Sequence, residues 1–228
     1  MKIQKGIQSG TLGATVSVNS KYGQVVRTRP RHNRQDTEAR LRSRNNCATY
    51  SRLWGRLTDQ QREGWMALAL HTSCRSAGGT GAPLHGCQLL VKINCTLAAA
   101  GLPPVKNPPR PAKFGPNPVQ RLRITSRQGK VKLELALDHP PAAHIVVLGS
   151  RPCSAGISVR SSYSIIGLLP APKRGLSDIT ALYVARFGEP PPGRRVFIRT
   201  RQIINGWVDA FKDTHARVPE AGDATVSP

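Results

Sequence analysis

Acidic side chains are scarce in this 228-residue chain, and their scarcity limits the chemistry open to it. Twelve Asp and Glu stand against 34 Lys and Arg, for a formal net charge of +22. Paired-carboxylate hydrolysis and acid-rich calcium sites need carboxylates that this sequence hardly supplies. The composition therefore disfavours a hydrolase or a calcium-binding protein and indicates a polyanionic partner.

Long apolar runs and paired cysteines are missing as well. No segment approaches the roughly 20 apolar residues of a membrane-spanning helix, and the first ten residues lack the apolar stretch of a signal peptide. The five cysteines include no Cys-x-x-Cys pair, which is typical of free thiols in a reducing compartment. We expect a protein that does not contact a membrane and is located in the cytoplasm or in a virion.

The positive charge is mainly arginine, and it is purest in sign at the N-terminal end. There are 24 Arg and 10 Lys, and the planar guanidinium suits bidentate contact with phosphate better than an ammonium does. Residues 1–75 hold 14 Lys and Arg against 4 acids, a net charge of +10. Residues 119–228 hold 16 against 8, so their charges are mixed. Polyanion contact is therefore expected in the N-terminal region.

An alternating series of arginines is the sharpest functional pattern. Residues 11–29 have the β-branched runs and central turn signals of a β-hairpin. Arginines then follow at every second position, and two residues of strand advance about 6.7 Å, roughly twice the ~3.4 Å axial phosphate spacing of one DNA strand. Such a row can follow a phosphate backbone without reading bases; the alternatives are a solvated strand face or an arm that packs on acidic subunits. The candidate nucleic-acid-binding residues are Arg27, Arg29, Arg31, Arg34, Arg40, Arg42 and Arg44.

Helical periodicity begins near Asp36. An apolar stripe at i, i+3, i+4 and i+7 ends at Leu57, and Thr58 with Gln61 forms a capping box that opens a second helix. Residues 72–82 are predicted to be a flexible loop, and a third helix is predicted from about residue 84 to Gly101. The residues expected in the helical core are Trp54, Leu57, Trp65, Leu90 and Ile93.

Histidine and cysteine around this loop superficially resemble a zinc site. The pattern H-x2-C-x10-H-x-C comprises His71, Cys74, His85 and Cys87. Its inner spacing, from cysteine to histidine, is shorter than in a standard zinc finger. We expect these side chains to be satisfied locally or exposed, with no metal or cofactor. Motifs of nucleophilic or zinc hydrolases are also missing, so no enzymatic activity is expected.

The C-terminal half changes from a period of about 3.6 to a period of 2. We expect a basic head over 1–102, a semi-rigid Pro-rich linker over 103–118, a small all-β sandwich over 119–217 and a loose tail over 218–228. The sandwich prediction counts the run 179–187 as a strand. Arg199 and Arg201 alternate within another strand, where pairing with acids across the sheet is favoured over a functional role. The fold class is therefore α+β.

Several segments resemble one family of uncharacterised proteins found in bacterial genomes and phage-like gene clusters. They include the helical motif W-x-x-L-T-x-x-Q-R-x-x-W from Trp54 to Trp65, the G-x-Q-L-L-V block from Gly86, and a block from Gly193 to Trp207. The resemblance covers most of the chain. It implies a helical head with a fibronectin type III-like sandwich behind it, in a mobile-element or virion setting.

Two functional hypotheses follow. The first is a non-enzymatic, nucleic-acid-associated protein of mobile-element or phage type, with DNA favoured over RNA, that contacts the phosphate backbone through its basic N-terminal region. The alternative is a virion structural or assembly protein, whose positive charge meets acidic virion proteins and which can form a homo-oligomer. Phosphate binding should depend steeply on salt, whereas an assembly role should appear as self-association or partner binding.

Overall fold

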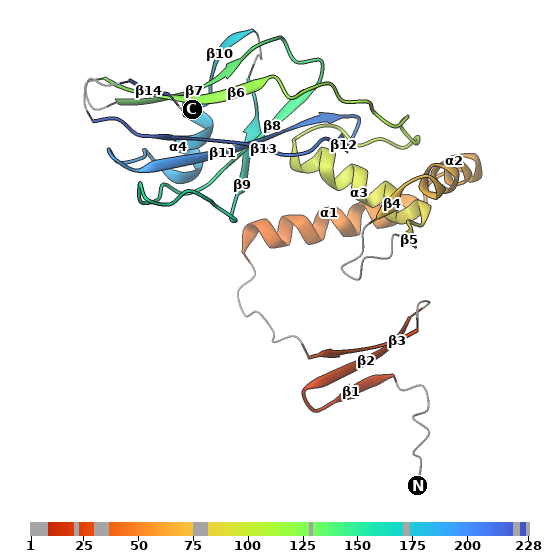
Figure 1. Cartoon of the computed structure of the whole chain (residues 1–228). Helices are drawn as coiled ribbons and strands as arrows, with labels where there is room; N and C mark the ends of the chain where they lie inside the picture. The colour runs from red at the N-terminus through yellow and green to blue at the C-terminus, as the bar shows by residue number, and fades with distance from the viewer. Residues whose placement is uncertain are drawn as a thin grey trace. The chain divides into compact units, whose positions relative to one another are not determined.

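The chain forms two compact units, Met1–Arg42 and Ser43–Pro228. The computed structural model describes residues 9–20, 23–29, 37–74, 82–127, 130–170, 174–220 and 224–226. Within these residues the fold is mixed α+β, with four helices and antiparallel sheets (Figure 1). None of the described helices has the length and apolar character needed to cross a membrane.

The first unit contains a three-stranded antiparallel sheet, which we call the head sheet. Its strands are β1 (Gly10–Leu12), β2 (Thr15–Ser20) and β3 (Gly23–Thr28), in the order β1-β2-β3. The hairpin expected over 11–29 is confirmed, and β1 is an addition to it. Gly13 makes the added turn at a left-handed φ of +55°, a conformation that glycine adopts without strain. No described residue of the head sheet is buried.

The helices of the N-terminal half are α1 (Glu38–Trp54), α2 (Asp59–Leu70) and α3 (Gly86–Ala99). The predicted capping box is present at the start of α2. The Thr58 hydroxyl accepts from the Gln61 N–H at 3.2 Å, and the Gln61 side-chain oxygen accepts from the Thr58 N–H at 3.0 Å. Of the loop predicted between α2 and α3, residues 75–81 lie outside the described residues. On either side of them, β4 (Ser73–Cys74) pairs with β5 (Ala82–Pro83).

Two antiparallel sheets form the C-terminal half. In the first, the order is β10-β7-β6-β14. In the second, the order is β12-β11-β8-β9, and β13 also pairs with β11. The strands of the first sheet are β6 (Val119–Arg127), β7 (Lys130–Leu137), β10 (Gly175–Asp178) and β14 (Ala224–Val226). Those of the second are β8 (His144–Gly149), β9 (Ser164–Leu168), β11 (Arg195–Ile204), β12 (Trp207–Val208) and β13 (Lys212–Arg217).

Apolar side chains on alternate strand positions build two cores. The first core contains inward residues of both sheets, such as Leu122 and Leu133 with Val147 and Ile198, all fully buried. The second core lies between the helices and the other face of the second sheet. There, Val146, Leu148 and Ile203 join Trp65, Leu89, Leu90 and Ile93. The second unit is therefore layered as helices, sheet and sheet, with an apolar core at each junction.

The Pro-rich segment 103–118 has no helix or strand, as expected, but it is not a free linker between domains. The units divide at Arg42 and Ser43, and this segment lies inside the second unit. The buried Asn94 side chain exchanges two hydrogen bonds with the Val105 backbone, at 2.7 and 3.0 Å. Further on, the Gln202 side chain donates to the Gly115 carbonyl at 2.8 Å. Side chains of the helices and of β11 thus fix a segment whose prolines cannot supply N–H donors.

The prediction of a strand over 179–187 is wrong, because these residues form α4 (Thr180–Phe187). Helical spacing brings Tyr183 and Phe187 to one side, where Tyr183 is fully buried in the first core and its hydroxyl donates to the Ser150 carbonyl at 2.8 Å. Asp178 accepts from the Thr180 N–H at 2.8 Å at the start of the helix. The β-branched residues of this run favour a strand by propensity, and tertiary packing overrides that preference in favour of the helix.

The prediction of a loose tail over 218–228 is also wrong for its described residues. Val218 is fully buried, and its N–H donates to the Arg194 carbonyl at 2.7 Å. Ala224–Val226 forms β14 and pairs with β6. The edge of β6 offers unpaired backbone groups, so a short segment can add to the sheet without a strong apolar pattern of its own.

The turn between β11 and β12 is also a contact point for α3. Asn205 and Gly206 both have positive φ, 49° and 85°, as a two-residue hairpin turn requires. A Cβ built on Gly206 would come within 2.4 Å of Ile93 on α3. Figure 1 shows α3 running past this end of the second sheet. Glycine is therefore required at position 206 both by the turn and by the helix packed on it.

Candidate nucleic-acid interface

Arg27 and Arg29 belong to the head sheet, where they are exposed. Arg27 lies opposite Val16 in the ladder, and Arg29 continues the pairing beyond β3, since its N–H donates to the Ala14 carbonyl at 2.7 Å. The expected alternation along an extended strand therefore holds for these two residues. The other two arginines of this stretch, Arg31 and Arg34, lie outside the described residues.

The remaining arginines of the series are on α1, so alternate spacing does not align them. In a helix, residues four apart share a side and residues two apart lie about 200° around the axis. Arg40 and Arg44 consequently share one side of α1, and Arg42 lies elsewhere, paired with Glu38 at 2.6 Å. Both members of that pair are largely exposed, and such surface pairs are weak and screened by salt. The single row of cations expected from the spacing does not continue into α1.

Apolar residues accompany the arginines on the head sheet. Leu12 is 82% exposed and Val26 is 62% exposed, and Val25 is about half exposed. Ladder pairing places Val16 and Val18 with Val25 and Arg27 on one face of the sheet, because partners across a ladder point the same way. Isolated three-stranded sheets are stabilised by covering such a face. The head sheet therefore offers both positive charge and unburied apolar area.

The outward face of the first sandwich sheet holds a second group of cations that the sequence reasoning did not single out. The members of this basic sheet face are Arg121, Arg123 and Arg127 on β6 and Lys130 and Lys132 on β7. Leu122 and Ile124 alternate with the arginines and point into the first core. The signal was present in the sequence as an alternation of cations and apolar residues over 121–132, with Gln128-Gly129 between the two runs.

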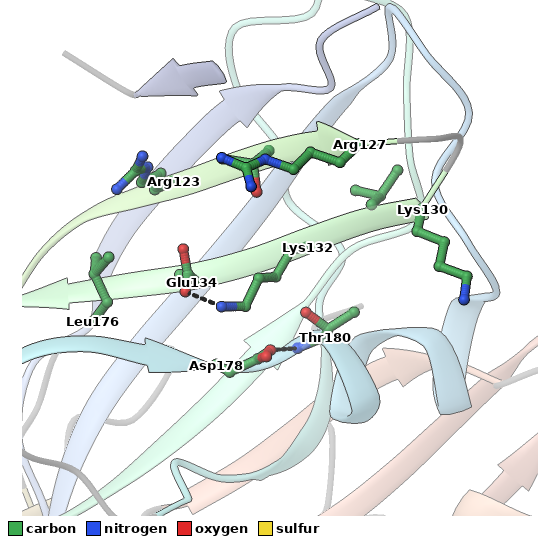
Figure 2. Close-up of a pocket in the computed structure, with 10 residues that line it drawn as sticks. Arg123, Arg127, Lys130, Lys132, Glu134, Leu176, Asp178 and Thr180 are labelled. Carbon is green, nitrogen blue, oxygen red and sulfur yellow. Dashed lines mark hydrogen bonds and ion pairs between the residues drawn. The ribbon is translucent and has the colours of Figure 1, made fainter. Parts of the chain in front are cut away.

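An open hollow of about 700 Å³ lies over this face. Figure 2 shows Arg123 and Arg127 on one strand and Lys130 and Lys132 on the next, with Asp178 at the far side. Its lining includes four cations and two acids, together with two threonines. The Glu134 carboxylate binds Lys132 at 2.5 Å, and this hydrogen bond raises the pKa of the Lys132 ammonium. Lys132 therefore remains charged over the physiological range.

The cationic end of the hollow lacks such compensation. Arg127 lies directly opposite Lys130 in the β6–β7 ladder, and like charges in this position destabilise a sheet. Among the residues that the structure describes, neither side chain has an ion-pair partner. The half-buried Arg123 also leaves its Nε hydrogen without an acceptor within the described part. Among the described residues, folding thus gathers positive charge at this end of the hollow and supplies no ion-pair partner for Arg127 or Lys130.

The arginines on β11 have a structural role instead. Arg199 forms a bidentate pair with Asp213 across the strands, at 2.5 and 2.7 Å, and its guanidinium stacks on Tyr163 at 4.2 Å. The pairing with an acid that the sequence favoured for Arg199 is confirmed. Arg201 lies over Phe211 at 5.1 Å, and burial lowers the pKa of its guanidinium.

The residues that resembled a zinc site have other partners or fall outside what is described. His85 caps α3, since its Nδ1 accepts from the Cys87 N–H at 3.2 Å. The side chain of Cys74 lies outside the described residues. Over the described part of the chain, no three His, Cys, Asp or Glu side chains gather closely enough to hold a metal ion. Cys87 is half-buried, and burial raises the pKa of its thiol.

The expected residues of the helical core lie together. Leu57, Trp65, Leu90 and Ile93 are at most 4% exposed, within the second core. Trp54 is half-buried and packs against the same core, with its ring 5.7 Å from that of His85. The Trp65 indole N–H donates to the Lys106 carbonyl at 2.8 Å. The helices thus hold the Pro-rich segment through a tryptophan as well as through Asn94.

Comparison with known proteins returns no relative for this chain. No protein-family model matches it, and neither a curated protein nor a solved structure does.

Proposed function

We propose that the protein is a non-enzymatic nucleic-acid-binding protein of mobile-element or phage type, which contacts the phosphate backbone through arginines between Arg27 and Arg44. The observation that carries this proposal is the exposure of Arg27 and Arg29 on a sheet with no buried residue in its described part. An arginine on an exposed strand can reach a phosphate without first breaking internal contacts. The net charge of +22 supplies long-range attraction toward a polyanion.

The antiparallel β2–β3 hairpin of the head sheet also suits the shape of a nucleic acid. The major groove of B-form DNA accommodates a two-stranded β-ribbon, and several DNA-binding proteins present strands to a groove in this way. This shape is the reason that DNA is favoured over RNA, whose major groove is deep and narrow. Contacts from guanidinium groups to phosphates position such a ribbon without reading sequence.

The direct test is fluorescence-anisotropy titration of a labelled DNA duplex with the full chain at about 50 and about 200 mM salt. Replacing Arg27 and Arg29 by Glu should weaken binding by at least about tenfold and reduce the salt slope by about 2, since each lost phosphate contact removes about 0.9. The double variant Lys92→Glu/Arg186→Glu is a matched control, because both residues are exposed and the charge change is the same. Equal losses in the two variants would overturn the assignment to the head sheet.

The second candidate function is a virion structural or assembly protein, favoured by the apolar area of the head sheet. Leu12 and Val26 are exposed on one face of the head sheet and Val25 on the other, and exposed apolar residues of this kind are typical of surfaces that another protein covers. Acidic virion proteins or a second copy of the chain are the proposed partners. Sedimentation velocity at increasing concentration tests self-association, and Val26→Lys should abolish it if the head sheet forms the interface.

For the sandwich we propose the fibronectin type III-like architecture. The support is the pairing of β6, β7 and β10 in one sheet, with β9, β8, β11 and β13 in the other. Consecutive antiparallel strands distributed in this way over two facing sheets are the pattern of that architectural group. α4 and β14 are additions to it.

A further inference from the structure

The basic sheet face is the strongest feature of the second unit that the proposed function leaves unused. It presents Arg121, Arg123 and Arg127 along β6 and Lys130 and Lys132 along β7, beside the 700 Å³ hollow. All but Arg123 are exposed. The face is built on strands whose other side chains are fixed in the first core, so the cations have a defined register.

We propose that this face is a second binding surface for a phosphodiester backbone. The proposal rests on the proposed function for the identity of the ligand, but the site is separate from the head sheet in sequence and belongs to the other compact unit. The chain would then contact one nucleic acid through two surfaces.

The first argument is the uncompensated charge. The Arg127 side chain lies across the ladder from Lys130, an arrangement that costs stability in the unliganded sheet. An anion placed between them converts that repulsion into two attractive contacts. Arg123 contributes an Nε–H donor that has no acceptor in the described part of the chain, and a phosphate oxygen is a suitable one.

The second argument is the linear arrangement, which favours a chain over a single small anion. From Arg121 to Arg127 the cations extend about 20 Å along β6, at about 3.3 Å per residue. Cations that bind one isolated phosphate converge on a point, whereas these follow two parallel lines. Both acids that line the hollow are engaged within the protein: Glu134, which lies opposite Arg123 in the ladder, is held by Lys132, and Asp178 accepts from the Thr180 N–H. A backbone that follows the arginines of β6 therefore passes one carboxylate, Glu134, whose charge Lys132 already balances.

The experiment uses the full chain in four forms: the native sequence, Arg127→Glu/Lys130→Glu, Arg27→Glu/Arg29→Glu, and the Lys92→Glu/Arg186→Glu control. The affinity for a labelled 20-nucleotide DNA is measured at about 50 and about 200 mM salt. This DNA extends beyond the basic sheet face by about six to seven nucleotides on each side. The Arg127/Lys130 variant should bind about tenfold more weakly, with a salt slope lower by about 2 than that of the native protein. If the Arg127/Lys130 variant has the same affinity and the same salt slope as the Lys92/Arg186 control, the inference is overturned.

The set of variants also separates this inference from the proposed function. Loss of binding in the Arg127/Lys130 variant alone supports the basic sheet face and removes the head sheet as the site. Loss of binding in the Arg27/Arg29 variant alone supports the head sheet as the site and overturns the inference for the basic sheet face. Competition with inorganic tripolyphosphate distinguishes the source of the phosphate. If tripolyphosphate binds more tightly than the DNA and only the Arg127/Lys130 variant loses it, the ligand is a small oligophosphate and the phosphodiester assignment is wrong.

A single substitution distinguishes ligand binding from a structural role. Arg127→Glu places a carboxylate opposite Lys130 and replaces a like-charge pair by an opposite-charge pair. The midpoint of thermal unfolding should therefore rise by about 1–3 °C, while DNA affinity falls. If Arg127 served the fold, the same change would lower the unfolding midpoint, and the inference would fail.

Discussion

The head sheet and the first sandwich sheet both present cations from antiparallel strands, but only one of them has a core. β6 and β7 bury alternate residues such as Leu122 and Leu133 completely, whereas no described residue of the head sheet is buried. In the sandwich, the core fixes the ladder register and hence the position of each outward charge. In the head sheet, no described residue is buried, so backbone pairing and exposed contacts set the register. The two sheets therefore present similar surface charge, but a buried core supports the cations of the sandwich sheet and not those of the head sheet.

The largest expected effect comes from removing packing in each sheet. Leu133→Ala empties a fully buried site in the sandwich and should lower the free energy of unfolding by about 2–5 kcal/mol. Val26→Ala in the head sheet should change it by less than about 0.5 kcal/mol, because Val26 is 62% exposed. Urea denaturation followed by circular dichroism measures both. A comparable cost for Val26→Ala would show that the head sheet is covered in solution.

A second contrast concerns buried polar side chains: the buried Asn94 holds the Pro-rich segment, whereas no described residue of the head sheet is buried. Asn94→Leu keeps a similar volume but leaves the N–H and carbonyl of the half-buried Val105 without their partner, at a cost of about 1–3 kcal/mol. Asn107→Leu is the control, since this exposed amide makes one side-chain contact with Gln61. The same denaturation experiment should give it a cost below about 0.5 kcal/mol. Equal costs would mean that the Pro-rich segment is free in solution.

The partial burial of Cys95 on α3 should also slow the alkylation of its thiol. Burial, with the Cys47 thiol 3.7 Å away, raises the pKa of Cys95 to about 11. Because the thiolate is the reactive form, alkylation of Cys95 near pH ~8.5 should be at least roughly tenfold slower in the folded than in the unfolded protein. Peptide mass spectrometry measures the rates, and Cys47→Ala should accelerate the reaction.

The direction of this shift also sets a pH dependence. The unfolded thiol ionises from its ordinary pKa of 9.0, while the folded one holds its proton until about 11. The stability contributed by Cys95 is complete below pH 9 and is lost as the pH rises toward 11. Cys95→Ser should flatten this part of the pH–stability curve. An unchanged slope would contradict the assigned pKa.

The smallest effect is expected at the exposed pair on α1. Glu38→Gln removes the partner of Arg42, and the stability should change by less than about 0.5 kcal/mol because both side chains are largely solvated. DNA affinity should increase slightly, by about twofold at most, since one competing carboxylate is gone. Anisotropy titration measures this change, and a loss of affinity would show that Glu38 orients Arg42 for binding.

Local signals predicted well the parts of the fold that local interactions build. The capping box at Thr58 and the helical spacing around Trp54 and Trp65 depend on residues a few positions apart, and the observed helices follow them. The errors arose where distant contacts decide. The run 179–187 becomes helical because Tyr183 packs into the sandwich core, and the tail forms β14 because β6 has a free edge.

The basic sheet face was missed for a related reason. The alternation of Arg121, Arg123 and Arg127 with apolar residues is legible in the sequence, but the meeting of Arg127 with Lys130 depends on ladder register. Conversely, even spacing made Arg40, Arg42 and Arg44 look like one row, and helical geometry separates them. Spacing predicts a shared face only once the type of element is known.

The turn at Asn205 and Gly206 has a consequence for how the molecule can be altered. Hairpin turns are usually the positions that accept insertions and substitutions most readily. Gly13, at the turn between β1 and β2, has no neighbouring atom in its way, so this turn has room for an insertion, although its φ of +55° still favours glycine at the position itself. Gly206 has no such room, because the backbone of the turn and the side chain of Ile93 on α3 both exclude a larger residue. A peptide tag or fluorescent label is therefore better inserted at the Gly13 turn, and the end of β11 should be left intact.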